Sequence, residues 1–356
     1  MKLHNYSTFS ISFFDQSART RAPRNVLLLQ RVLQGHLKYL WVAVRDRWEL
    51  RLRHMLHFND WSGEELLELV NRGLEVKRNP GRYVKALEGK TLGMVFQKTS
   101  TRTRVSFEAG MTQLGGHAIH LDWRTTNFVL ADIRDETRCL DKYADIIMAR
   151  LLKHSELEKM ASVSRVPVIN GCCEKYHPTQ GLADLLTILE TKHTLRGTKL
   201  TYIGIHNNVC NTLIEGCTKT GIEITTVTPE TNKPSVDNNL LVEAEKTGLY
   251  KRTLDLDKAV KDADFLYTDS WVDMEFFLDP KFEQEKERRV ALMMPYQINE
   301  TLLKKTKAHI LHDLPAHRGY EISDAALEDP RCIAFQQAEN RMHAEKALML
   351  ELLNKK

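Results

Sequence analysis

The sequence predicts an α/β protein with two domains, each built on a mainly parallel sheet flanked by helices. Two observations carry this prediction. Short apolar runs alternate along the chain with segments whose apolar residues recur at helical spacing, and this alternation favours parallel sheets. The chain has 356 residues, which is enough for two domains of ordinary size. Ligands of such sheets bind at the ends of the strands, so polar residues that follow strands are the first candidates for a site.

The first half of the chain contains a helix, then strands alternating with helices. The first helix is expected at residues 66–76, because Ser62 and Glu65 form a capping-box pattern before it. Further helices are expected at 105–114 and 135–143. Strands are expected at 90–96, 116–122, 145–150 and 166–170.

The second half repeats the theme after a long helix at 181–195 that is expected to join the domains. The last helix, at 332–353, is expected to pack back on the first domain and carries Arg341 near its start. We therefore expect a first domain at 55–190, a second at 191–334 and a C-terminal helical segment at 335–356. Strands of the second domain are expected at 200–205, 222–227, 265–268 and 308–311.

Residues 1–54 differ in composition from the rest, with ten Lys or Arg against three acidic residues. An Arg-rich, acid-poor leader is typical of organelle targeting. Helical apolar spacing over 26–53 equally allows an added amphipathic helix, and the folded protein could instead start at Met55. The sequence leaves these three interpretations open.

Composition restricts the partners and the compartment. The net charge is +4, and the charged residues, 28% of the chain, are spread rather than grouped in blocks, so no nucleic-acid partner is indicated. No apolar run is long enough to span a membrane. The six cysteines show no zinc-site spacing, so we expect no metal. Free cysteines inside apolar patterns indicate a reducing compartment, and a cytoplasmic protein is the default expectation.

The most informative stretch is 98–104 (KTSTRTR), which lies where a predicted strand turns into a predicted helix. Hydroxyl groups, guanidinium groups and the free N–H groups of a helix N-terminus would converge there, as a phosphate dianion requires. The alternative is an ordinary Ser/Thr helix cap with two solvated arginines. A P-loop does not explain the stretch, because its GxxxxGK[ST] pattern is absent from the sequence.

Five separated motifs resemble those of the aspartate/ornithine carbamoyltransferase superfamily, and most closely those of ornithine carbamoyltransferases. The resemblance runs from about Met55 to the C-terminus, with the motifs in family order. They are STRTR at 100–104, Arg150 at the end of its strand, HPTQGLAD at 177–184, HNN at 206–208 and AENR at 338–341.

The resemblance implies a two-domain enzyme that is a trimer or a multiple of trimers, with active sites shared at subunit boundaries and no metal or organic cofactor. It assigns the first domain to carbamoyl phosphate and the second to the amine acceptor. The phosphate would be held by Ser100, Thr101, Arg102 and Thr103. The carbamoyl group would be held, or bridged to the phosphate, by Arg150, His177, Gln180 and Arg341.

The acceptor side departs from the family pattern. Asn208 and Asp269 match family contacts to the acceptor, and Met274 and Leu314 keep their places in two loops. Asp273 stands where the family has Ser, Glu275 where it has Gly and Asp313 where it has Cys, and 126–132 lacks the family's Gln-Leu-Gly-Arg-Gly-Glu pattern. Asp313 could accept the proton that leaves the amine.

The resemblance therefore predicts transfer of the carbamoyl group to ornithine, giving citrulline and phosphate in arginine metabolism. Arg102, Arg150, His177 and Asp313 would carry the catalysis. Two alternatives stay open: a more cationic or otherwise different acceptor, such as the diamine putrescine, and a homologue that binds carbamoyl phosphate without turnover.

Overall fold

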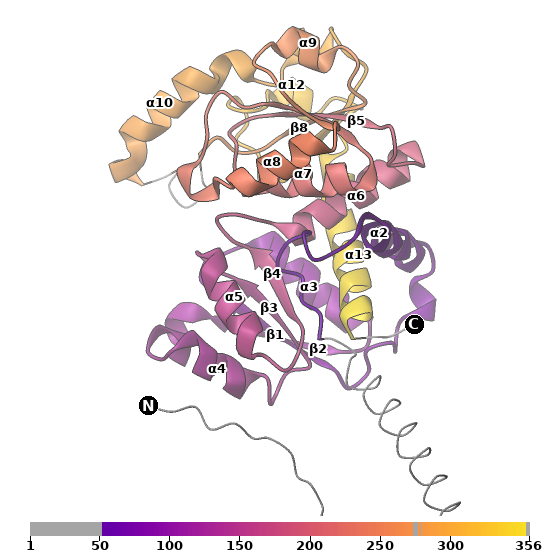
Figure 1. Ribbon diagram of the computed structural model, residues 1–356, viewed down its shortest axis with the longest axis vertical. Coiled ribbons are helices and arrows are strands. Elements are labelled where there is room, and N and C mark those ends of the chain that lie inside the picture. Colours follow the sequence, from indigo (N-terminus) through magenta and orange to yellow (C-terminus); the bar gives the residue numbers. More distant parts are fainter. Residues whose placement is uncertain (1–51, 273–276, 278, 354–356) are drawn as a thin grey trace, which may run out of the picture. The chain divides into compact units, whose positions relative to one another are not determined.

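The computed structural model describes residues 52–272, 277 and 279–353. These residues form two parallel sheets with helices around them, which confirms the predicted fold class (Figure 1). The first sheet has the strand order β2-β1-β3-β4. Its strands are β1 (Thr91–Phe96), β2 (His117–Asp122), β3 (Ile146–Arg150) and β4 (Val168–Cys172).

The first sheet is preceded by α2, whose capping box is confirmed. Ser62 Oγ accepts from Glu65 N at 3.1 Å, and Ser62 N donates to the Glu65 carboxylate at 2.8 Å. Shifts of a few residues elsewhere have local causes: α4 starts at Ile133, not at 135, because Asp132 caps it by accepting from Arg134 N. The helices of this half are α2 (Gly63–Arg78), α3 (Thr101–Gln113), α4 (Ile133–Leu140), α5 (His154–Val163) and α6 (Pro178–Lys192).

The second sheet has the order β7-β6-β5-β8-β9, again with every pair parallel. Its strands are β5 (Lys199–Ile203), β6 (Glu223–Val227), β7 (Tyr250–Arg252), β8 (Phe265–Thr268) and β9 (His309–His312). The helices are α7 (Asn208–Thr220), α8 (Asn238–Lys246), α9 (Leu256–Val260), α10 (Glu283–Met293), α11 (Glu300–Leu303), α12 (Asp324–Leu327) and α13 (Ala334–Leu352).

Single-turn 3₁₀ helices complete the connections. They are Pro80–Arg82, Trp123–Thr125, Asn127–Val129, Lys233–Ser235, Pro280–Phe282 and Met294–Tyr296. In the part of the chain that the structure describes, no helix is both long and apolar enough to cross a bilayer.

The C-terminal helix α13 returns to the first half of the chain, as predicted, and packs against α2, α3 and α6 (Figure 1). Gly73 of α2 allows this close packing: a Cβ there would lie 2.4 Å from Leu186 Cδ1 of α6 and 3.7 Å from Ala344 Cα of α13. The AENR motif lies one turn into α13, so Arg341 projects from the helix body rather than from its first residues.

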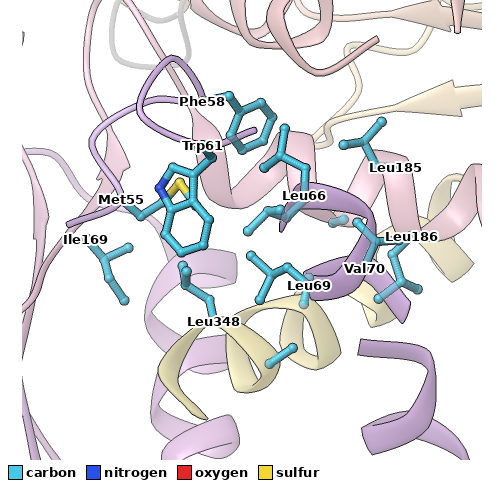
Figure 2. Close-up of a cluster of buried hydrophobic side chains, with 14 of the residues drawn as sticks. Met55, Phe58, Trp61, Leu66, Leu69, Val70, Ile169, Leu185, Leu186 and Leu348 are labelled. Atoms are coloured by element: carbon cyan, nitrogen blue, oxygen red, sulfur yellow. The ribbon is translucent and has the colours of Figure 1, made fainter. Parts of the chain in front are cut away.

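A segment ahead of α2 closes the core between these helices. Met55 N donates to Val168 O at 2.9 Å and Asn170 N donates to Met55 O at 2.8 Å, so the segment is bonded to β4. Figure 2 shows the resulting cluster of buried side chains: Met55, Phe58, Trp61, Leu66, Leu69, Val70, Ile169, Leu185, Leu186 and Leu348.

The segment before Met55 is described only from Leu52. Arg53 pairs with Glu65 at 2.8 Å and lies 3.7 Å above the ring of Trp61. The other expectations for the leader, including targeting and an added helix, fall on residues outside the described part. The domain boundaries at 54, 190 and 334 stay predictions.

Candidate active site

The phosphate motif lies where the sequence predicted it, between β1 and α3. Ser100 is the N-cap of α3: its Oγ accepts from Thr103 N at 3.3 Å, and its hydroxyl donates to Thr103 Oγ1 at 3.1 Å. Thr101, the first residue of α3, is exposed. The neighbouring strand brings Arg150 to the same edge, because Phe96 and Arg150 are register partners in β1 and β3. The site therefore begins at the carboxyl ends of two adjacent parallel strands.

Arg341 joins three of the predicted residues in one buried cluster. Its Nη2 donates to Thr103 Oγ1 at 2.6 Å and to His177 Nε2 at 3.1 Å. Its Nη1 donates to Gln180 Oε1 at 3.1 Å. Arg341 is only 2% exposed, so these contacts are shielded from water. Residues from α3, α6 and α13 thus meet around one guanidinium group.

His177 precedes α6 and is held by the second half of the chain, since His177 N donates to Thr212 Oγ1 of α7 at 2.8 Å. Burial, and then the positive charges of Arg341, Arg150 and Arg102, hold the pKa of His177 well below its usual value. Arginine only donates hydrogen bonds, so His177 Nε2 is the acceptor toward Arg341 and the imidazole is neutral with its proton on Nδ1.

Three guanidinium groups make this site strongly positive. Burial lowers the pKa of Arg102, and the positive charges of Arg341 and Arg150 act in the same direction while Asp313 opposes them. The Nε atoms of Arg102 and Arg150 are buried, and neither has a hydrogen-bond partner among the described residues. Arg150 Nη1 makes one long contact, 3.4 Å to Gly171 O. Buried donors without acceptors indicate a place for an anion.

The acceptor candidates lie at the ends of β5 and β8. Asn208 Nδ2 donates to Cys173 O at 2.7 Å and lies 3.2 Å from Cys172 Sγ, so it contacts the loop after β4. Asp269 accepts from Asn207 Nδ2 and from Ser270 N, both at 2.7 Å. Burial, and then the nearby charge of Asp313, raise the pKa of Asp269 to about 7.

Asn207 was missed by the sequence reasoning, although the HNN motif contains it. Its Oδ1 caps α7 by accepting from Val209 N and Cys210 N, each at 3.1 Å, which leaves its Nδ2 for Asp269. The motif's first Asn therefore holds Asp269 in place, and its second contacts the first half of the chain.

Asp313 faces the donor-side cations. Its Oδ1 lies 3.7 Å from Arg341 Nη1, within ion-pair range, and has no hydrogen-bond partner among the described residues. A hydrogen bond spans Asp313, since Leu314 N donates to His312 Nδ1 at 2.7 Å. The Leu314–Pro315 peptide bond is cis. Asp273, Met274 and Glu275 lie outside the described residues, so their expected positions stay predictions.

Glu345 is a further carboxyl that the sequence did not single out. It is fully buried one turn beyond Arg341, and its Oε1 lies 3.4 Å from Arg341 Nε. Burial raises its pKa to about 8, although the charge of Arg341 acts in the opposite direction. Within residues 52–353, apart from the gaps near 273–278, no group of three or more His, Cys, Asp or Glu side chains is arranged to hold a metal ion.

Comparison with known proteins identifies the class. Residues 53–190 match the family model described as the aspartate/ornithine carbamoyltransferase, carbamoyl-P binding domain, and residues 196–352 match the corresponding Asp/Orn binding domain. The chain therefore belongs to the aspartate/ornithine carbamoyltransferase family, and it is a carbamoyltransferase.

Individual relatives with high similarity to this chain are ornithine carbamoyltransferases. The chain is 40% identical to the ornithine carbamoyltransferase of Bacillus anthracis over 310 residues, covering 85% of this chain and 95% of that protein. It is 40% identical over 314 residues to the enzyme of the same name from Pyrococcus horikoshii, covering 85% and 96%.

Solved structures of ornithine carbamoyltransferases are also similar to this chain. Ornithine carbamoyltransferase from Pyrococcus furiosus aligns with a TM-score of 0.77 at 38% identity, covering 85% of this chain and 97% of that one. The structure of ornithine carbamoyltransferase from Thermus thermophilus aligns with a TM-score of 0.75 at 35% identity, covering 84% of this chain and 98% of that one.

Proposed function

We propose that the chain transfers the carbamoyl group of carbamoyl phosphate to the side-chain amine of ornithine, giving citrulline and phosphate. The observation that carries the proposal is the cluster in which Arg341 meets Thr103, His177 and Gln180, beside the partly buried side chains of Arg102 and Arg150, whose Nε atoms are buried. The ornithine carbamoyltransferases of about 40% identity support the choice of acceptor.

The donor fits the positive side of this cluster. Its phosphate would lie at the N-terminus of α3, where Ser100, Thr101, Arg102 and Thr103 supply hydroxyl, guanidinium and N–H donors. Its carbamoyl group would lie toward Arg150, His177, Gln180 and Arg341. Arg102 Nε and Arg150 Nε would find acceptors in the bound donor, which accounts for their lack of partners among the described residues.

Catalysis would rest on fixed charge. A neutral amine forms a bond to the carbamoyl carbon, negative charge builds on the carbamoyl oxygen, and the bond from that carbon to the phosphate oxygen breaks. Guanidinium groups already in place stabilise both oxygens without reorganisation. A neutral His177 can contact the carbamoyl group without adding a further positive charge. The proton released by the amine needs a base, for which Asp313 is the candidate.

Asn208 and Asp269 would hold the α-carboxylate and α-amino group of the acceptor, with Met274, Leu314 and Asp273 along the loops around it. The charge of Asp313 would affect which amine the site prefers. Its carboxylate lies 3.7 Å from Arg341, so part of its charge is already compensated within the protein. This favours ornithine over a more cationic acceptor, because Asp313 does not need a second positive charge from the substrate.

We further expect a homotrimer or a multiple of trimers, since the family shares its active sites between subunits. The cytoplasmic location and the absence of nucleic-acid partners also stay predictions.

The test is carbamoyl transfer by the purified protein. Carbamoyl phosphate is supplied with ornithine and, in parallel, putrescine, lysine, acylated ornithines and aspartate, and the carbamoylated product and phosphate are both quantified. Ornithine is expected to give the highest kcat/KM. A preference for putrescine would instead mean that the added carboxylates define a diamine site, and no product with any amine would contradict the proposal.

A further inference from the structure

A buried carboxyl lies directly behind the donor-binding cluster. Asp184, on α6, is fully buried, and its Oδ1 accepts from Gln180 Nε2 at 2.8 Å, from Gln337 Nε2 at 2.6 Å and from Tyr267 OH at 3.4 Å. These three donors come from α6, α13 and β8. Its Oδ2 has no hydrogen-bond partner among the described residues. Asp184 therefore connects the two halves of the chain without reaching the proposed donor site.

Asp184 decides how the Gln180 amide is oriented. The carboxyl oxygen takes the Nε2 end of the amide, so the Oε1 end accepts from Arg341 Nη1. If the amide were reversed, its NH₂ group would face a guanidinium that can only donate, and both hydrogen bonds would be lost. The orientation of Gln180 toward Arg341 thus depends on a residue that contacts neither Arg341 nor, in the proposed function, the substrate.

Gln337 extends the connection to the acceptor side. While its Nε2 donates to Asp184, its Oε1 accepts from His312 N at 2.9 Å. His312 is the last residue of β9 and immediately precedes Asp313. An unbroken series of buried hydrogen bonds therefore runs from the backbone beside Asp313, through Gln337, Asp184 and Gln180, to Arg341.

We propose that Asp184 and Gln337 are positioning residues for the transfer reaction: they fix the Gln180 amide toward Arg341 and tie it to the start of the loop that carries Asp313. The inference rests on the proposed function for the identity of the reaction. It assigns no substrate contact to either residue. As a consequence, Gln180 and Arg341 on the donor side keep a fixed position relative to the loop that carries Asp313 on the acceptor side.

The first test replaces Gln337 by Leu, which has similar volume and no hydrogen bonds, with Gln336→Leu as the matched control. Gln336 is the preceding residue of α13 and donates to Glu190, away from Asp184. We expect Gln337→Leu to weaken carbamoyl phosphate binding in calorimetry at least threefold and to lower kcat/KM for both substrates about tenfold or more. The control is expected to stay within twofold of the wild type. A folded Gln337→Leu protein with wild-type affinity and kinetics would overturn the inference.

The second test uses a more conservative variant of Gln337, which serves if Gln337→Leu does not fold. Gln337→Glu retains an oxygen for His312 N but can donate to Asp184 only when a proton is shared between the two carboxyl groups. Because burial raises the pKa of Asp184 to about 8, that proton is held at neutral pH and lost above it. The kcat/KM of Gln337→Glu is therefore expected to fall, relative to the wild type measured in parallel, as the pH rises past about 8, whereas a residue that only fills space would leave the profile unchanged. This variant decides the question even where Gln337→Leu does not fold.

An error in the proposed function can be distinguished from an error in the role of Asp184 and Gln337. If the wild type does not carbamoylate ornithine, the choice of acceptor is wrong. Carbamoyl phosphate binding needs no acceptor, and its response to Gln337→Leu still decides the role of the hydrogen-bond series on the donor side.

Discussion

Arg341 Nη2 donates to the hydroxyl of Thr103 across 2.6 Å, although 238 positions separate the two residues. Thr103 belongs to the helix that follows β1, and Arg341 to the last helix. The STRTR motif and the C-terminal helix are therefore parts of one hydrogen-bonded cluster, although they lie far apart in the described chain.

The Thr103 hydroxyl can be tested with a pair of conservative variants. Thr103 is fully buried, and Thr103→Val keeps its branched shape while leaving Arg341 without this acceptor. We expect the KM for carbamoyl phosphate to rise by one to two orders of magnitude, because the lost partner is a charge-assisted hydrogen bond in a buried site. Thr103→Ser keeps the hydroxyl and is expected to stay within a few-fold of the wild type. Equal kinetics for both variants would contradict the assignment.

The STRTR motif contains its own control for the role of Arg102. Arg102 has a buried Nε with no partner in the described part of the chain, whereas the side chain of Arg104 is 49% exposed and pairs with Glu108 at 3.3 Å. Arg102→Ala is expected to weaken carbamoyl phosphate binding by about a hundredfold or more. Arg104→Ala should change it little, because an exposed ion pair contributes at most about 1 kcal/mol. Calorimetric titration with carbamoyl phosphate compares them; similar losses for the two would argue against a specific phosphate contact by Arg102.

Asp313 is expected to set the pH dependence of the acceptor site. Burial comes first among the causes that raise the pKa of Asp269 to about 7, and the charge of Asp313 comes second. Asp313→Asn removes that charge together with the proposed base, so kcat/KM should fall at every pH while the pKa of Asp269 falls toward its ordinary value. The ionised form would then persist to lower pH, and the acid limb of kcat/KM for ornithine should move to lower pH. An acid limb that stays in place in the variant would show that Asp269 does not control it.

Glu345 should make the folded protein less stable as the pH rises. Its pKa is about 8 in the folded state, against an ordinary value of 4.5, so the folded state binds more protons between these values. The contribution of Glu345 is thus fully present below pH 4.5 and is lost as the pH rises through 8. Glu345→Gln should remove this loss, which is on the order of a few kcal/mol for a shift of this size.

Urea unfolding at pH 5 and pH 8.5 measures the effect of Glu345. The wild type should lose more stability than Glu345→Gln between the two pH values. Asp184, whose pKa burial also raises to about 8, is present in both proteins and cancels in the comparison. Parallel pH profiles for the two proteins would contradict the prediction.

Sequence patterns predicted the strands well because a buried parallel strand is an unbroken apolar run. Strand β8 matches its expected range, and the ends of the other predicted strands shift by at most two residues. Strand β7 was missed because two of its three residues, Lys251 and Arg252, are charged and exposed at the sheet edge. Helix α5, which starts at His154, was missed too, and its N-cap residue Lys153 makes no side-chain capping hydrogen bond.

The residues of the candidate site also form two groups, those that the sequence identified and those that it did not. Residues within short motifs, such as Thr103, His177, Gln180 and Arg341, were identified from sequence, and the fold brings them together. Asp184 ends the HPTQGLAD motif but, like Gln337, was given no role, because a polar side chain inside a buried helical segment has no pattern that reveals its partners. Their roles depend on donors from β8, β9 and α13, which only the folded chain brings within 3.4 Å.

The position of α13 has a consequence for biosynthesis. Since α13 is translated after every other element of the fold, the apolar faces of α2, α3 and α6 that it covers stay open on the ribosome until it emerges. The nascent chain also lacks Arg341 until that moment, so the contacts of Arg341 with Thr103, His177 and Gln180 are the last to form. A chain that stops before α13 would leave those apolar faces uncovered, and exposed apolar surface of this kind promotes aggregation.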